Sequence, residues 1–486
     1  MLFNSYEFIF LFLPITLIIY FWLNKYNKNR LAKAWLVITS LYFYSYFHKS
    51  YLILITISIL VNYYIGQKLS DEKYNVIQRK IFLTVGIVFN LGGLGYFKYY
   101  DFFVSNINIV LGTNLPLLHI LLPLGISFFT FQQLSFVIDS YKKYHLSYDF
   151  LDYCLFVTFF PQLIAGPIVL PTEMLPQFEA EENKKINWEN MNKGLYIFSI
   201  GLAKKVIIAD TIANFANAGF DMMDKLNFVE AWLTSISYTL QLYFDFSGYC
   251  DMAMGIGLMF NIILPANFNS PYKSTNIQEF WKRWHMTLGR FMTNYLYIPL
   301  GGNRKGEVKT LRNLFIVFLA SGIWHGAGWN FVIWGMLHGI CILIHRVWKN
   351  SGRKLNKLVG WFITMNLVNI FWVFFRAETV SNAMKVIKGM FNIHSFYYLF
   401  QNIETLKELT RMYRIAVNEN IYSLKIGLII FIMSMLLIYL PKKTSINKEI
   451  KIKEMLLQSI YISTSLIFMF LYKVLEVKEN FIYFNF

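Results

Sequence analysis

The chain has 486 residues, of which 56% are hydrophobic, 19% aromatic and only 15% charged. Soluble domains carry roughly one quarter charged residues, so this composition excludes a soluble multidomain enzyme, a disordered protein and a fibrous repeat. Lysine and arginine outnumber aspartate and glutamate by 45 to 28, which gives a net charge of +17. The basic residues lie mostly in short connections between apolar stretches, as the positive-inside rule requires. We therefore predict a polytopic helical membrane protein that contacts membrane lipids and a cytosolic anion, and not nucleic acid.

The first apolar run, 8–23, is predicted to be a membrane helix and not a signal peptide. No basic residue precedes it and no small-residue cleavage site follows it. The next connection holds four basic residues and no acidic one: Lys25, Lys28, Arg30 and Lys33. The connection 66–80 is again rich in lysine and arginine. Both connections are predicted to be cytoplasmic, which places the start of the chain outside.

Further apolar runs predict about eleven to thirteen membrane segments, some tilted, paired or re-entrant, because several runs are shorter than the ~20 residues of a perpendicular span. They occupy 35–47, 51–65, 81–97, 115–138, 150–170, 194–213, 229–246, 249–264, 311–323, 329–345, 359–375, 421–440 and 455–473. We predict one integral membrane domain over 1–486. Its core covers 1–390, and 391–486 holds a loop and the last two membrane helices. The polar stretches 179–193 and 401–420 are too short for a soluble catalytic domain and are predicted to be loops or interfacial helices.

Two acidic residues, Asp245 and Asp251, lie in the apolar, glycine-rich stretch YFDFSGYCDMAMGIG. A carboxylate at membrane depth costs a few kcal/mol, so each needs a reason to be there. Aspartate is a preferred helix N-cap. We expect both to cap helices, Asp251 at the start of a helix over 252–260, and keep a direct catalytic role as the alternative.

A helix is predicted over 276–295, between flanking prolines and glycines. At helical spacing four of its residues share one face: Trp281, Trp284, His285 and Leu288. The basic residues Lys282 and Arg283 point elsewhere, and Glu279 is placed to pair with Arg283. A basic face opposite a tryptophan-rich face suits a helix in the membrane interface.

The basic face of this helix, together with Arg304, could hold an anionic donor such as a coenzyme A phosphate. Contact with lipid phosphates explains the same residues equally well. His285 lies on the aromatic side, where a histidine is either a hydrogen-bonded core residue or a catalyst. These alternatives stay open on the residues alone.

A second informative stretch, LASGIWHGAGWNFVIWGMLHG, places His325 beside Trp324 and among three glycines. So many glycines make a continuous helix unfavourable. Irregular backbone at membrane depth survives only where protein or a wet cavity surrounds it. We predict a break at His325 that could present a catalytic base, with a structural histidine as the alternative. Asn330 is predicted to cap the following helix, and His338 to serve in packing or hydrogen bonding.

The sequence offers no metal site and no covalent-serine or nucleotide-hydrolysis motif. The histidines show no HExxH pattern and no nearby pair of carboxylates. Neither a GxSxG elbow nor a Walker loop occurs. The three cysteines are far apart, without CxxC spacing, and are predicted to be small core residues.

These stretches resemble the signature of the membrane-bound O-acyltransferase family, in particular its bacterial alginate and peptidoglycan O-acetyltransferase branch. The matching segments are MLFNSYEFIFLFLPI, LPLGISFFTFQQLSFVIDSY, FFPQLIAGPI, YFDFSGYCDMAMGIG, NFNSPYKSTNIQEFWKRWHMTLG, YIPLGGNRKG, GIWHGAGWNFVIWGMLHG and FWVFFRA. They span residues 1 to about 390 in the family's order. One departure is the segment 291–295, Phe-Met-Thr-Asn-Tyr, where family members commonly read Trp-Phe-Arg-acidic-Tyr. No role is carried over for the missing pair.

The resemblance implies an all-α fold around a tunnel that joins a cytosolic donor site to an outward acceptor site. The family's invariant histidine falls on His325 and its second conserved polar position on His285. The implied donor is acetyl-CoA, with no bound cofactor or metal. The implied acceptor is a hydroxyl of an extracytoplasmic glycan, usually reached through an exported partner protein. The implied location is the bacterial cell membrane.

We expect His325 to act as the general base and His285 to orient the thioester or stabilise the oxyanion. Seven residues are expected to bind substrate: Trp281, Lys282, Arg283, Trp284, Arg304, Trp324 and Asn330. One alternative inside the family is D-alanyl transfer from a carrier protein to teichoic acid. Another class is a glycan or lipid transporter, which the lack of glycine-rich breaks before residue 242 disfavours. A non-catalytic scaffold is a further alternative. The sequence does not identify the polysaccharide.

Overall fold

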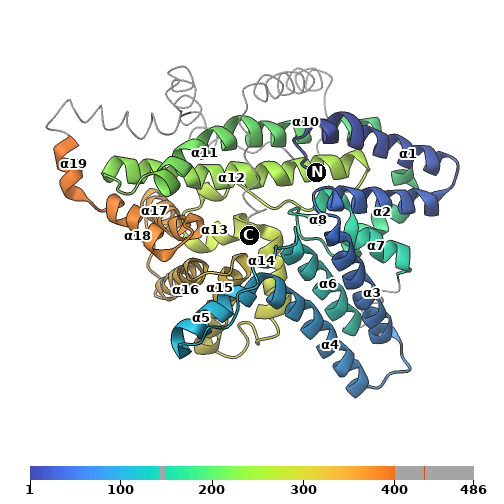
Figure 1. Cartoon of the computed structure of the whole chain (residues 1–486), viewed down its shortest axis with the longest axis horizontal. Coiled ribbons are helices and arrows are strands. Elements are labelled where there is room, and N and C mark those ends of the chain that lie inside the picture. The colour runs from blue at the N-terminus through green and yellow to red at the C-terminus, as the bar shows by residue number, and fades with distance from the viewer. Residues whose placement is uncertain (143–147, 400–431, 433–486) are drawn as a thin grey trace. The chain divides into compact units, whose positions relative to one another are not determined.

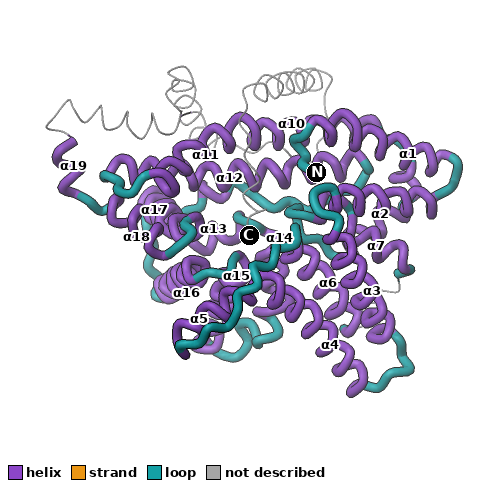
Figure 2. Tube along the Cα trace, viewed as in Figure 1, coloured by secondary structure: helices purple, strands orange, loops and turns teal. Residues whose placement is uncertain are grey.

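The computed structural model describes residues 1–142, 148–399 and 432. Every regular element in this part of the chain is helical and none is a strand (Figure 2). This confirms the all-α fold class predicted from the sequence. The described residues form two compact units. The first holds Met1–Ile200 and Tyr249–Ala266, and the second holds Gly201–Gly248 and 267–399.

The first unit contains helices α1 to α9 and most of α10 (Figure 1). Their bounds are α1 Leu13–Lys25, α2 Asn29–Ser45, α3 Ser50–Ser70, α4 Val76–Leu94, α5 Tyr100–Leu111, α6 Ile126–Tyr141, α7 Phe150–Thr158, α8 Phe160–Leu163, α9 Pro171–Glu179 and α10 Trp188–Ala203. Widened π-type turns lead into α1 and join α4 to α5, and a 3-10 turn follows α9. Helices α3, α4 and α6 pack against one another, and α2 packs against α1 and α7.

Five buried polar side chains of the first unit, here called the amide cluster, bond to one another across four helices: Ser58, Asn62, Asn90, Gln133 and Tyr153. Asn62 Nδ2 donates to Gln133 Oε1 at 2.8 Å, and Asn90 Nδ2 donates to Asn62 Oδ1 at 2.5 Å. Gln133 Nε2 donates to Ser58 Oγ at 2.9 Å, and the Tyr153 hydroxyl donates to Gln133 Oε1 at 3.1 Å. Such bonds fix neighbouring helices to one another in apolar surroundings, where water is not available to replace them.

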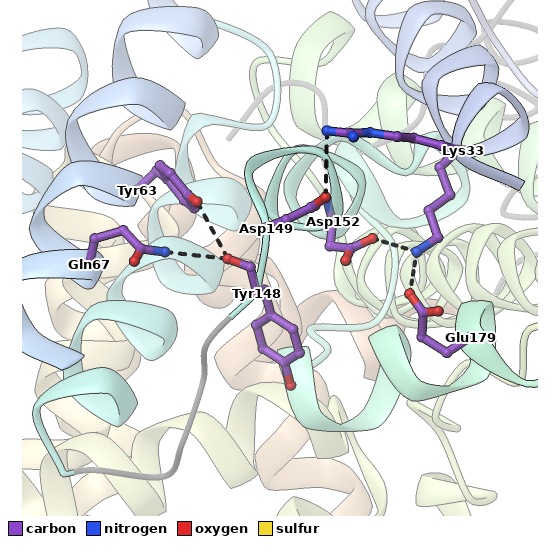
Figure 3. Close-up of polar contacts among 8 residues, drawn as sticks. Lys33, Tyr63, Gln67, Tyr148, Asp149, Asp152 and Glu179 are labelled. Atoms are coloured by element: carbon purple, nitrogen blue, oxygen red, sulfur yellow. Dashed lines mark hydrogen bonds and ion pairs between the residues drawn. The ribbon is translucent and has the colours of Figure 1, made fainter. Parts of the chain in front are cut away.

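A second polar group of the first unit joins three helix ends through one lysine (Figure 3). Lys33 Nζ on α2 lies 2.7 Å from Asp152 Oδ1 on α7 and also pairs with Glu179 on α9. Arg30 lies at the 4.0 Å limit of an ion pair with Asp149. Two of the four basic residues of the first predicted cytoplasmic connection, Arg30 and Lys33, thus pair with carboxylates of the same unit.

The second unit contains α11 and α13 to α19 and the first part of the 32-residue helix α12. Their bounds are α11 Asp210–Asn217, α12 Phe228–Met259, α13 Ile277–Arg283, α14 Met286–Met292, α15 Glu307–His325, α16 Trp329–Asn350, α17 Lys357–Arg376, α18 Val380–Met390 and α19 Ile393–Leu399. Helix α16 packs against α13, α15, α17 and α18. It is therefore the central helix for the site described below.

Helices α15 and α16 approach closely where two glycines meet. A methyl group at Gly335 would lie 2.7 Å from the Phe318 carbonyl oxygen and 3.1 Å from Gly322 Cα. One at Gly322 would lie 2.5 Å from the Phe331 carbonyl oxygen. Small residues of this kind let helix backbones pack closely in membranes. The contact brings the end of α15 beside the first turns of α16.

The expectation that Asp245 and Asp251 cap helices is wrong, because both lie inside the continuous helix α12. Asp245 Oδ1 lies 2.7 Å from Lys205 Nζ, and the same ammonium lies 2.7 Å from Asp210 Oδ1. All three side chains are almost fully buried. An ion pair with a lysine from another turn, and not a helix end, is what allows Asp245 to be buried.

Five helical segments in the described part of the chain are long and apolar enough to cross a membrane: Glu7–Lys25, Ser50–Ser70, Val76–Leu111, Trp329–Asn350 and Lys357–Arg376. The other apolar runs form shorter or interrupted elements. The run predicted over 115–138 becomes helical only at Ile126, and the runs 229–246 and 249–264 fall largely within α12. The stretch 179–193 holds a 3-10 turn and the start of α10. The predicted segments 401–420, 421–440 and 455–473 lie outside the described residues, apart from residue 432.

Candidate active site

The predicted break at His325 is confirmed. Helix α15 ends at His325, and α16 begins at Trp329. Gly326 and Gly328 between them have extended backbone. A methyl group at Gly326 would lie 2.1 Å from the Phe331 ring, so any side chain there would displace that ring. His325 is thus the last residue of a helix that stops abruptly.

The His325 ring is surrounded by other aromatic rings and is only 3% exposed. Its centroid lies 4.8 Å from that of Trp324, 5.1 Å from Trp334 and 5.0 Å from Phe375. The Trp334 and Phe375 rings stand nearly perpendicular to it, at 88° and 72°. Three different helices, α15, α16 and α17, therefore fix the position of this imidazole.

The prediction of one helix over 276–295 is wrong, because the chain breaks at His285. Helix α13 ends at Arg283 and α14 begins at Met286. His285 has φ +44° and ψ +55°, in the left-handed region that residues with side chains rarely adopt. Such backbone persists only where surrounding contacts hold it, and it is concentrated at functional sites.

Asn267 supplies the contacts that hold the break. Its carbonyl oxygen accepts the Met286 N–H at 2.9 Å. Its side-chain Oδ1 lies 3.1 Å from His285 Nδ1 and accepts both the N–H and the hydroxyl of Thr287, at 3.2 Å and 3.0 Å. Asn267 is fully buried, and His285 is 1% exposed. Burial lowers the pKa of His285, which lies outside the five candidate spans, to about 3. The ring is therefore neutral near pH 7.

The two breaks bring His285 and His325 together, with ring centroids 6.5 Å apart. Trp324 lies beside both rings, 6.3 Å from His285 and 4.8 Å from His325. Phe246 on α12 covers His285 at 4.9 Å. We call these six residues the histidine cluster: Phe246, His285, Trp324, His325, Trp334 and Phe375. The structure thus joins two histidines and Trp324, which the sequence suggested, inside one buried aromatic environment.

Trp281 and Trp284, both predicted to bind substrate, pack around this cluster. Trp284 is buried against Phe280 and Trp372, at 5.6 Å and 5.0 Å between ring centroids. Trp281 Nε1 donates to His338 Nδ1 at 3.2 Å. The last contact confirms that His338 has a packing and hydrogen-bonding role.

The three cations predicted to bind an anion are not part of the buried cluster. Lys282 and Arg304 are exposed. Arg283 is half-buried and pairs with Glu279 at 2.8 Å, as predicted. Burial raises the pKa of Glu279, but hydrogen bonds from Thr275 and Arg283 outweigh it and hold that pKa below its ordinary value. These cations remain available to a charged group at the surface.

Asn330 does not cap α16, which corrects the prediction. The residue before the helix is Gly328, and the Asn330 side chain instead donates to the carbonyl oxygens of Ala377 at 2.6 Å and Phe374 at 3.3 Å. Because these carbonyls end α17, Asn330 fastens the start of α16 to the end of α17. The two helices that it joins carry Trp334 and Phe375.

Sequence reasoning missed four residues of the site: Phe246, Asn267, Trp334 and Phe375. Phe246 and Phe375 lie in quoted segments, FDFSG and FWVFFRA, but as ordinary apolar residues they gave no separate signal. Asn267 is the first residue of the NFNSPY segment. A polar residue directly after an apolar run could have indicated that its side chain has a specific partner. No group of three or more histidine, cysteine or acidic residues in the described part of the chain could hold a metal ion.

Comparisons with known proteins identify the kind of chemistry. Residues 50–377 match the model of the membrane-bound O-acyltransferase family. The chain is 49% identical over 451 residues to the peptidoglycan O-acetyltransferase of Helicobacter pylori, covering 86% of this chain and 84% of that protein. It is 39% identical over 398 residues to a probable alginate O-acetylase of Pseudomonas aeruginosa, covering 81% and 75%. A teichoic acid D-alanyltransferase of Bacillus subtilis is 29% identical over 252 residues, covering 49% and 61%.

Proposed function

Because this chain belongs to the membrane-bound O-acyltransferase family, we propose that it moves an acetyl group from cytosolic acetyl-CoA to a hydroxyl of an extracytoplasmic polysaccharide. It is a multi-pass membrane protein and an O-acyltransferase. The donor, the acceptor and the catalytic residues are the parts that this proposal adds. The bacterial cell membrane is its location, in keeping with its bacterial relatives.

One observation carries the proposal: two histidines, each at a break between helices, lie 6.5 Å apart ring to ring in a buried aromatic environment. A break between helices leaves backbone groups without helical hydrogen bonds, which is costly in apolar surroundings. Two such breaks are therefore expected where they present functional side chains. A neutral imidazole is able to accept a proton from a hydroxyl. Tight aromatic surroundings exclude the water that would otherwise hydrolyse the donor.

The reaction needs one proton acceptor and close placement of two reactants. The hydroxyl oxygen forms a bond to the thioester carbonyl carbon while His325 takes the hydroxyl proton. The carbon–sulfur bond then breaks, and the proton passes from His325 to the coenzyme A thiolate. One ester and one thiol result. Base catalysis of this kind contributes about 10²–10⁴ in rate, and holding the reactants in a near-attack arrangement adds a further entropic contribution.

The exposed cations Lys282 and Arg304 and the half-buried Arg283 support an anionic donor, as a coenzyme A phosphate would be. Peptidoglycan is the favoured acceptor, because the named relative that modifies it has a higher identity to this chain, 49%, than the alginate relative, 39%. We also propose that an exported partner protein delivers the acetyl group to the glycan.

The assignment of the histidines is tested by acetyl transfer from radiolabelled acetyl-CoA, measured on purified His325→Ala and His285→Ala variants at equal folded amounts. We expect transfer to fall by about 10²–10⁴ for His325→Ala. The matched control is His338→Gln, another buried histidine of the second unit, whose replacement still accepts the Trp281 N–H. It is expected to keep its activity. Undiminished transfer by His325→Ala would refute the assignment of the base.

The donor and acceptor are tested separately from the histidines. Mass spectrometry of the peptidoglycan, from cells with and without the protein, is expected to show acetyl groups that depend on it. The weaker likeness to a teichoic acid D-alanyltransferase names the competing outcome. D-alanine loss from teichoic acid, together with binding of an acyl carrier protein and no turnover of acetyl-CoA, would replace the proposed reaction with D-alanyl transfer.

A further inference from the structure

The hydrogen bonds around Asn267 determine which way its side-chain amide faces. The backbone N–H of Thr287 points at the Asn267 side-chain atom 3.2 Å away, and the Thr287 hydroxyl lies 3.0 Å from the same atom. A backbone N–H can only donate. The atom it faces must therefore be the amide oxygen, because the amide nitrogen would place two donors against each other. The oxygen and nitrogen of the Asn267 amide, which are usually hard to tell apart, are assigned by these two contacts.

The orientation of the amide in turn determines the tautomer of His285. His285 Nδ1 lies 3.1 Å from the same Asn267 oxygen. A carbonyl oxygen accepts and never donates, so Nδ1 must carry the hydrogen. In a neutral imidazole the other nitrogen, Nε2, then holds the lone pair and acts as a hydrogen-bond acceptor.

We propose that Asn267 is a positioning residue that holds His285 in the Nδ1–H tautomer, so that Nε2 accepts a hydrogen bond from a hydroxyl of the polysaccharide. This inference rests on the proposed function for the identity of the substrate, but not for the tautomer. It resembles the general arrangement in which a third group orients an imidazole through one ring nitrogen and leaves the other for the reaction.

The tautomer rules out both roles that the sequence suggested for His285, which were to orient the thioester and to stabilise the oxyanion. A thioester carbonyl and a developing oxyanion offer only acceptor atoms, and Nε2 of this tautomer has no hydrogen to give them. A sugar unit offers several O–H donors close to one another. His285 therefore contacts the polysaccharide, which accepts the acetyl group, and not acetyl-CoA. It holds one sugar hydroxyl close to the hydroxyl that loses its proton to His325.

The backbone geometry supports a built site and not an accidental contact. The segment 267–269 runs beside 283–286 and is joined to it by two backbone bonds, from Asn269 N–H to the Arg283 oxygen and from Met286 N–H to the Asn267 oxygen, both 2.9 Å. These bonds hold His285 in its left-handed conformation, with φ +44°. One buried residue, Asn267, thus sets both the backbone and the tautomer of the same histidine.

The tautomer is measured directly by nitrogen NMR of the full-length protein, labelled with ¹⁵N-histidine and reconstituted in lipid nanodiscs. A His285→Gln sample identifies the His285 signals among the eight histidines. We expect a protonated Nδ1 and an unprotonated Nε2 in the wild type and in Asn267→Asp, which keeps the acceptor oxygen. Asn267→Ala is expected to lose this pattern. The control is Asn313→Ala, a fully buried asparagine of the same unit that bonds to Leu300 and Gly302 carbonyls instead.

Acetyl transfer supplies the second measurement. We expect Asn267→Ala to lower transfer by about 10- to 100-fold, as loss of an orienting partner does elsewhere, with KM rising for the glycan acceptor and not for acetyl-CoA. Asn267→Asp should recover much of the activity. A rise confined to the KM for acetyl-CoA would overturn the assignment of His285 to the acceptor side.

The two proposals fail in different ways. A wild-type His285 protonated at Nε2, or a tautomer unchanged in Asn267→Ala, overturns the role of Asn267 whatever reaction the protein catalyses. The expected tautomer pattern, with no acetyl transfer to any glycan, supports the role of Asn267 in setting the tautomer and overturns the proposed function together with the substrate hydroxyl assigned here.

Discussion

The amide cluster of the first unit and the histidine cluster of the second unit both bury polar side chains in apolar surroundings, but they are built differently. The amides lie within regular helices and bond to one another, with Gln133 at the centre of three such bonds. The imidazoles of His285 and His325 lie at chain breaks and are surrounded by aromatic rings. Buried polarity alone therefore does not show whether a polar group serves stability or chemistry.

The two clusters differ in the backbone distortion that each one requires. An amide within a helix costs no backbone distortion, and its donors and acceptors are satisfied by its neighbours. His285 requires left-handed backbone, and a side chain at position 326, next to His325, would displace the Phe331 ring. The comparison predicts that changes in the amide cluster alter stability, whereas changes in the histidine cluster alter catalysis.

The largest stability effect is expected from a third buried group, the ion pairs of Lys205 with Asp210 and Asp245. Lys205→Met removes the cation that both carboxylates contact at 2.7 Å. Breaking a buried ion pair in this way costs about 3–5 kcal/mol. Denaturation of the purified protein in mixed micelles measures the change, with Lys205→Arg as the control that keeps the charge. If Lys205→Met unfolds like the wild type but no longer transfers acetyl, these residues take part in the reaction. That result would contradict a purely structural role for the buried ion pairs.

The next effect tests how far the histidine cluster depends on the contact between α15 and α16. Gly335→Ala adds a methyl group 2.7 Å from the Phe318 oxygen, and overpacking of this kind costs about 1–3 kcal/mol. We expect acetyl transfer per folded molecule to fall as well, because Trp334 and His325 lie on the two helices that are pushed apart. Gly339→Ala is the matched control on the same helix, since its methyl group would meet only side-chain atoms, at 3.0 Å or more. Equal effects of both substitutions would contradict this account.

The two breaks show how much of the site could be predicted from the sequence. The break at His325 was predictable because its cause is local, three glycines beside one histidine. The break at His285 was not predictable, because the sequence Trp-His-Met in itself suits a helix. Its cause is Asn267, which lies 18 positions earlier in the chain. Helix periodicity therefore placed His285 on the right aromatic side but with the wrong backbone.

Local capping rules failed for the same physical reason. Asp245 and Asn330 are residue types that often cap helices, yet each is satisfied by a distant group, the Lys205 ammonium and the Ala377 carbonyl. Tertiary partners of this kind leave no mark in the adjoining sequence. The all-α class and the membrane character were predictable because composition, apolar runs and the family's motifs carry them.

A smaller effect tests the structural side of the comparison. Gln133→Leu removes the acceptor for Asn62 and Tyr153 and the donor to Ser58. Hydrogen bonds between membrane helices average about 0.6 kcal/mol and reach about 1.7 kcal/mol, so we expect a loss of about 1–2 kcal/mol. Acetyl transfer per folded molecule should stay at the wild-type value when both are measured on the same preparation. A variant of normal stability that no longer transfers acetyl would show that the amide cluster also serves the reaction.

The smallest effect concerns the exposed side of the break at His285, where Glu279 pairs with Arg283 at 2.8 Å. The folded protein holds the pKa of Glu279 below its ordinary value, because the Thr275 and Arg283 hydrogen bonds outweigh the effect of burial. A carboxyl group with a lowered pKa stabilises the fold above its ordinary pKa, and that contribution is lost as the pH falls through the folded value.

The Glu279 and Arg283 side chains are both about one third exposed, so Glu279→Gln should cost only about 0.3–0.5 kcal/mol at pH 7. The difference from wild type should vanish in acid. Denaturation of both proteins at neutral and acidic pH measures it, and a difference that grows towards acid would contradict the assigned sign.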